Sequence, residues 1–86
     1  HKMSSPYPNP FNPVVNFDLE ISGNNFVDAR IYDINGREVA TLHSDIMLGS
    51  NQTISWAANN HASGIYFLQV VIDNQLTKRD KIVLLK

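Results

Sequence analysis

The chain of 86 residues contains no cysteine. This absence excludes disulfide support for the core, thiol catalysis and thiolate metal sites. Charged residues make up only 17% of the sequence and the formal net charge is −1, so the chain offers no broad positive surface to nucleic acid. No apolar run approaches the ~20 residues of a membrane helix, and we expect no membrane insertion. Length and composition leave one small domain.

The first residues differ from the rest of the sequence. His1, Lys2 and Met3 indicate the remnant of a linker or of cloning, and the apolar core of a signal peptide is missing. If the parent protein is exported, its signal peptide therefore lies upstream of this fragment. Residues 1–5 are assigned to the linker remnant and residues 6–86 to a single domain.

All four prolines lie between Pro6 and Pro13. Each proline fixes its own φ angle and disfavours helical geometry in the residue before it. The segment is therefore predicted to be extended and stiff, with Tyr7 and Phe11 free to pack against the domain.

Beyond Pro13 the sequence alternates between apolar and polar residues, and no segment has helical periodicity over ten or more residues. This pattern predicts an all-β fold, an immunoglobulin-like antiparallel β-sandwich of about seven short strands. The expected strands cover residues 15–21, 27–34, 37–42, 52–56, 65–72 and 76–85, with turns at 22–25, 35–36 and 73–75 and loops at 43–51 and 59–64.

Local residue types refine this prediction. Asn35-Gly36 indicates a type I′ hairpin turn, which needs a positive φ at both central residues. Residues 65–72 are nearly all apolar or aromatic, which predicts a central strand covered on both faces. The side chains expected to be largely buried are Phe17, Leu19, Ile31, Val39, Trp56, Tyr66, Leu68 and Val70.

Motifs that carry chemistry are missing. His1, His43 and His61 lack metal-ligand spacing and are interpreted as surface residues. No nucleophile elbow or glycine-rich phosphate loop is present, so we expect no enzyme activity, no metal and no cofactor. Tyr66 and Phe67 are adjacent and point to opposite faces of a sheet, which favours core packing over a sugar-stacking platform.

Four motifs occur in order along the chain. The first is proline-rich, the second a Tyr-Asp-x-x-Gly-Arg hairpin, the third a Ser-Gly-x-Tyr strand and the fourth a pair of lysines at the end. They are Tyr7-Pro8-Asn9-Pro10-Phe11-Asn12-Pro13, Ile31-Tyr32-Asp33-Ile34-Asn35-Gly36-Arg37-Glu38-Val39, Ser63-Gly64-Ile65-Tyr66-Phe67 and Lys81-Ile82-Val83-Leu84-Leu85-Lys86. Over essentially all of residues 6–86 the chain resembles the type A C-terminal sorting domains of the type IX secretion system.

The resemblance implies a non-catalytic signal that directs an attached cargo protein out of a Gram-negative cell. Cargo of this kind enters the periplasm by its own signal peptide and passes through the outer-membrane type IX translocon. The domain can be cleaved by a sortase-like surface peptidase, with the cargo left at the cell surface or in the medium. The resemblance implies recognition by the translocon for Pro8, Asn9, Pro10, Tyr32, Asp33, Gly36, Arg37, Ser63, Gly64, Tyr66, Lys81 and Lys86.

The last strand is a candidate recognition edge, because it combines lysines with backbone groups that a partner strand could bind. Lysines on an edge strand also deter aggregation, and both roles can hold together. Two other functions remain open at this point. One is a structural immunoglobulin-like module of the flagellar hook-cap scaffold type, and the other is a carbohydrate-binding accessory module of a secreted hydrolase.

Overall fold

The computed structural model describes the backbone of residues 1–86 and, apart from residue 50, their side chains. It is all-β and antiparallel, which confirms the predicted class. The described chain has no helix that could span a membrane. Its strands are β1 (Lys2–Met3), β2 (Val14–Asp33), β3 (Glu38–Ala57), β4 (Gly64–Ile72) and β5 (Gln75–Leu84).

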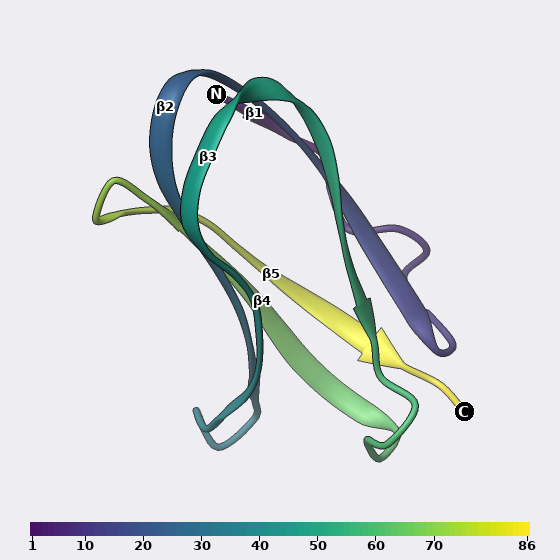
Figure 1. The fold of residues 1–86 in the computed structure, drawn as a ribbon. Helices are drawn as coiled ribbons and strands as arrows, with labels where there is room; N and C mark the ends of the chain where they lie inside the picture. The colour runs from purple at the N-terminus through teal and green to yellow at the C-terminus, as the bar shows by residue number, and fades with distance from the viewer.

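Two layers arise because β2 and β3 fold over together (Figure 1). The first layer contains β1, the first half of β2 and the second half of β3. The second layer contains the second half of β2, the first half of β3, β4 and β5. β4 lies between β2 and β5, so it is an interior strand of the second layer.

The fold-over replaces two predicted breaks. A turn at residues 22–25 and a loop at 43–51 were expected, and both predictions are wrong, because pairing of β2 with β3 continues through them. A register shift between Ile21 and Asn24 and a φ of 74° at Gly23 bend the ladder without reversing the chain. A Cβ atom on Gly49 would lie 2.8 Å from the backbone nitrogen of Gly23, so glycine permits the close approach. Four of the expected short strands therefore form two strands of 20 residues each.

The two tight hairpins differ from one another. At the first, the Asp33 N–H donates to Arg37 O and the Gly36 N–H donates to Asp33 O. Only Gly36 of this turn has a positive φ, 80°, so the predicted type I′ turn is wrong and a three-residue loop with a glycine bulge stands in its place. The second turn, expected at residues 73–75, is confirmed, with φ of 49° at Asp73 and 66° at Asn74.

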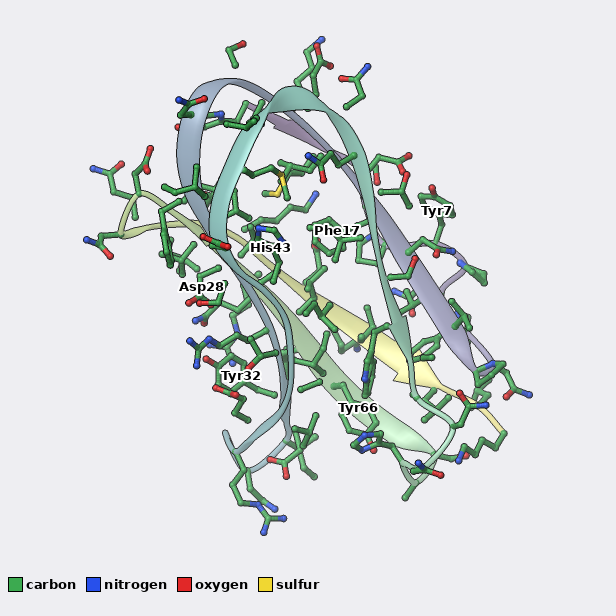
Figure 2. The ribbon with its side chains drawn as sticks, viewed as in Figure 1. Tyr7, Phe17, Asp28, Tyr32, His43 and Tyr66 are labelled. Atoms are coloured by element: carbon green, nitrogen blue, oxygen red, sulfur yellow. The ribbon has the colours of Figure 1, made fainter. Side chains whose placement is uncertain are left out.

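The core lies between the layers, where Phe17 points inward (Figure 2). Of the eight residues expected to be largely buried, seven are buried and Val39 is partly buried against the core. The prediction that strand 65–72 is covered on both faces is wrong. Tyr66, Leu68, Val70 and Ile72 face the core, whereas Ile65 on the opposite face is 41% exposed, because no third layer covers it.

The N-terminal segment packs as predicted at one of its two aromatic residues. Phe11 is 2% exposed, and Tyr7 remains exposed at the surface. The peptide bonds before Pro8, Pro10 and Pro13 are cis. The residues assigned to a linker remnant also contact the sheet, since β1 pairs with Leu19–Glu20 of β2.

Candidate functional site

The hairpin motif is held by its own aspartate. Asp33 Oδ1 accepts the N–H groups of Asn35 at 2.9 Å and Arg37 at 3.0 Å. Asp33 Oδ2 accepts Arg37 Nε at 3.1 Å. The hydrogen bond from the Arg37 backbone, followed by contributions from Asn35 and the Arg37 charge, lowers the pKa of Asp33 against an opposing effect of burial. Asp33, Gly36 and Arg37 therefore fix the shape of this turn.

The proline-rich motif covers the backbone edge of β5. Asn9 Oδ1 accepts the Val83 N–H at 3.0 Å, and Asn9 Nδ2 donates to Lys81 O at 3.0 Å. Phe11 continues this pairing, because its N–H donates to Val83 O and its carbonyl accepts the Leu85 N–H. The side chain of Asn9 thus takes the place of a strand residue, between the exposed Pro8 and Pro10. The edge suggested for partner-strand addition is occupied from Lys81 to Leu85.

The third motif and the last lysine meet at one end of the sandwich. Ser63 Oγ accepts the Lys86 N–H at 2.9 Å, and Lys86 Nζ donates to Asn59 O at 2.6 Å. The Tyr66 hydroxyl donates to Ala62 O at 2.6 Å. Lys86 is exposed, but its ammonium group is already bound to the loop that precedes β4. Gly64 has a φ of 154° and is the first residue of β4.

A cluster of rings lies beneath this loop. Trp56 lies with its ring centroid 5.8 Å from Phe11, 5.2 Å from Tyr66 and 5.1 Å from His61. The cluster joins the proline-rich motif to the Ser-Gly-x-Tyr motif. His61 is therefore packed against the core, and His43 lies in β3 with a buried Nε2. The interpretation of these two histidines as plain surface residues is wrong, because each contributes a partly buried ring.

The structure brings most of the motif residues together. A hollow of about 150 Å³ lies between the hairpin and the start of β4, lined by Asp33–Asn35 and Ser63–Tyr66. Tyr32 and Lys81 lie elsewhere, on the outer face of the second layer, each directly opposite Phe67 of β4. The motif residues therefore lie in three places: at this end of the sandwich, on the outer face of the second layer, and along the β5 edge that Pro8–Pro10 cover.

Charges on that outer face are distributed unevenly. Arg30 binds Asp28 at 2.7 Å and Glu38 at 2.6 Å. Both carboxylates raise the pKa of Arg30, Asp28 more than Glu38. The pKa of Glu38 is lowered mainly by a hydrogen bond from Thr41 and next by its hydrogen bond with Arg30. On this face of β2 and β3, two carboxylates therefore share one guanidinium.

Two residues on this face were not proposed from the sequence. The guanidinium carbon of Arg79 lies 4.9 Å from the centroid of the Phe67 ring, within the range of a cation–π contact. Alternation along residues 76–85 could have placed Arg79 and Lys81 on one face of the strand, since they are two residues apart. Their contact with Phe67 depends on the pairing register, which the local sequence does not specify.

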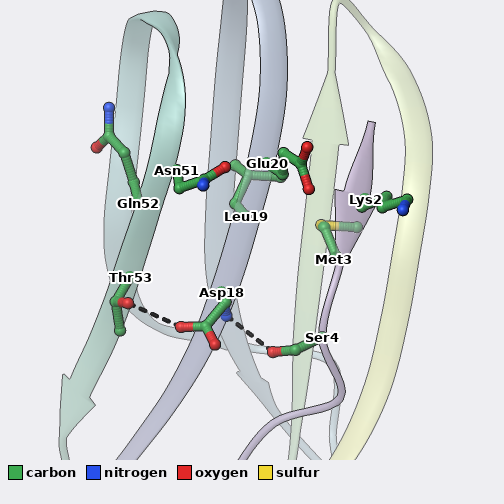
Figure 3. A pocket seen from close by; sticks show the side chains of 9 residues that line it. All are labelled: Lys2, Met3, Ser4, Asp18, Leu19, Glu20, Asn51, Gln52 and Thr53. Carbon is green, nitrogen blue, oxygen red and sulfur yellow. Dashed lines mark hydrogen bonds between the residues drawn. The ribbon is translucent and has the colours of Figure 1, made fainter.

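A further hollow lies on the outer face of the first layer (Figure 3). It has a volume of about 560 Å³, and Asp18 is its central carboxylate. Asp18 Oδ1 accepts the hydroxyl groups of Thr53 and Tyr7, each at 2.7 Å, which lowers its pKa. The same bond to Asp18 raises the pKa of Tyr7. Asp18 therefore joins Tyr7 of the proline-rich motif to Thr53 of β3.

Among the residues that the structure describes, no three histidine, aspartate or glutamate side chains lie close enough together to hold a metal ion.

The comparison with known families agrees with the motifs. A family model described as the secretion system C-terminal sorting domain matches residues 5–85. The chain belongs to this family. A type IX sorting domain implies interaction with the type IX secretion machinery, attachment to a cargo protein, and export to the cell surface or extracellular space. No curated protein and no solved structure matches the chain.

Proposed function

We propose that this sorting domain is a folded, non-catalytic signal that directs its cargo from the periplasm through the outer-membrane type IX translocon. The observation that carries the proposal is the family match over residues 5–85. The motif residues support it, because hydrogen bonds join segments more than 70 residues apart in sequence, and ring contacts join Phe11 to Trp56 and Trp56 to Tyr66. A signal assembled from distant segments is available only in the folded state.

The recognition element is proposed to comprise the residues of the four motifs. One group of these residues shapes the surface indirectly, because their hydrogen bonds or backbone conformations hold the fold together. These residues are Asn9, Asp33, Gly36, Arg37, Ser63, Gly64 and Tyr66. Tyr32, Lys81 and Lys86 present side chains at the surface, and Pro8 and Pro10 flank Asn9. A sortase-like peptidase then removes the domain and leaves the cargo at the surface.

Two carboxylates that line hollows are used within the domain. Asp18 Oδ1 accepts two hydroxyl groups. Asp33, in the hollow beside β4, accepts two backbone N–H groups and Arg37. Both serve as structural hydrogen-bond acceptors, which supports a non-catalytic role. We expect no hydrolase activity, and no saturable binding to cell-wall polysaccharides in calorimetry.

The proposal is tested with a fusion of a signal peptide, a fluorescent protein and residues 1–86 in a host that carries the type IX system. The matched control lacks residues 5–86. Fluorescence outside the outer membrane should require the domain and an intact translocon. Equal export of both fusions, or unchanged export in a translocon mutant, would contradict the proposal. A size difference between the periplasmic and the surface forms would report cleavage.

A further inference from the structure

The backbone edge of β5 is closed over Lys81–Leu85, so what this part of the strand offers a partner is its side chains. Asn9 and Phe11 occupy its outward backbone groups. Side chains alternate along a strand. Ile82 and Leu84 are fully buried, which leaves Arg79, Lys81 and Val83 on the opposite, outer face.

These side chains continue an apolar strip across the second layer. The pairing register places Phe67 between Tyr32 and Lys81, and places Val83 opposite Ile65. Figure 2 shows Tyr32 on the outer side of the sheet, away from the core. Ile65 is 41% exposed, and no further layer covers it. We call this set the outer strip: Tyr32, Ile65, Phe67, Arg79, Lys81 and Val83.

The outer strip carries positive charge that the domain does not compensate. Asp28 and Glu38 on the same face are bound by Arg30. Among the described residues, neither Arg79 nor Lys81 forms an ion pair. The Arg79 guanidinium lies over the Phe67 ring. Two cations therefore lie beside exposed apolar surface, where a partner carboxylate would be partly shielded from water and bind more strongly than at an open surface.

A small hollow gives this charge a defined geometry. It has a volume of about 250 Å³ and is lined by Tyr32, Gly36, Gln69 and Arg79. The Arg79 guanidinium can donate to a carboxylate in two parallel hydrogen bonds. Gln69 adds an amide donor in the same hollow. A carboxylate that enters there would place its neighbouring residues over Phe67 and Tyr32.

We propose that the outer strip binds a protein segment of the type IX machinery that carries an acidic residue next to apolar or aromatic residues. This inference rests on the function proposed above, and it identifies the face that is read and the chemistry of its partner. A protein partner fits better than an anionic membrane. Two cations are few for lipid binding, since each contributes about 1 kcal/mol near a charged membrane.

The test uses the fluorescent fusion with the double variant Arg79→Gln and Lys81→Gln. Its matched control is Lys2→Glu, which makes the same change in net charge on an exposed residue of the first layer. The double variant should reduce export at least tenfold and leave the melting temperature within two degrees of the parent. The control should export like the parent. The single variant Lys81→Gln, at a side chain that forms no ion pair among the described residues, should reduce export by a smaller factor.

The outcomes separate the inference from the function on which it rests. If the parent fusion is exported and the double variant is exported equally, the outer strip is not read, and the sorting function stands. If Lys2→Glu reduces export as strongly, the effect is one of net charge and the inference fails. If the parent fusion itself is not exported, both proposals fail. Binding of the parent domain to vesicles of anionic phospholipid, lost in the double variant while export is kept, would assign the strip to a membrane and overturn the inference.

Discussion

The backbone edge of β5 is bound by another segment of the domain, whereas the charged side chains on its outer face have no ion-pair partner among the described residues. Along the edge, donors and acceptors of Lys81–Leu85 are taken by Asn9 and Phe11. On the outer face, Arg79 and Lys81 have no carboxylate partner among the described residues. Family motifs near opposite ends of the sequence therefore form one structural unit. The proline-rich motif closes an edge, and the last strand keeps its charged side chains available.

The largest expected effect concerns the rings that hold the edge cover in place. Trp56→Ala should lower the free energy of unfolding by ~3–5 kcal/mol, because Trp56 is buried and contacts Phe11 and Tyr66. Urea unfolding followed by circular dichroism measures the change. A variant that melts within a few degrees of the parent would show that the cover does not depend on this cluster.

A smaller effect is expected at the cover itself. Asn9→Ala should cost about 1–3 kcal/mol, because the Val83 N–H and the Lys81 carbonyl both lose their partner. Asn12→Ala, at an exposed neighbour between Pro10 and Pro13, should stay within about 0.5 kcal/mol of the parent. Equal urea midpoints for the two variants would remove Asn9 from the account of the edge.

The hairpin end should respond to acid. The pKa of Asp33 is lowered in the folded state, so its contribution to stability is complete above the unfolded pKa, ordinarily about 3.9. That contribution is lost as the pH falls through the folded pKa. Asp33→Asn should therefore flatten the decline of melting temperature below about pH 4. Glu20→Gln, at an exposed carboxyl, serves as the control, and a slope unchanged by Asp33→Asn would refute the assignment.

The smallest effect on stability is expected on the outer face. The double variant Arg79→Gln and Lys81→Gln should change the free energy of unfolding by only about 0–1 kcal/mol, since it removes one exposed cation–π contact and no ion pair. Thermal melting checks this. A fall of several degrees in the melting temperature would mean that these cations stabilise the domain. The outer face would then resemble the edge in contributing to stability.

Alternation in the sequence predicted the all-β fold, the antiparallel arrangement and most of the core, because side-chain period depends on local positions alone. It did not predict the bend, since Ser22–Asn25 has the composition of a turn whether the chain reverses or two paired strands fold over. The contact of Asn9 with Val83 could not be predicted either, because it joins residues 74 positions apart. The positions of Arg79 and Phe67 were readable from alternation, but their contact depends on the register between β4 and β5.

Hydrogen exchange of two backbone amides measures directly whether the backbone edge of β5 is closed. The Val83 and Leu85 N–H groups point away from β4 and are bound by Asn9 Oδ1 and Phe11 O. If the edge is closed, both amides should exchange as slowly as those of β4, and Asn9→Ala should speed exchange of Val83 more than that of residues in β4. Exchange of Val83 and Leu85 at the rate of open edge amides in the parent domain would contradict the account.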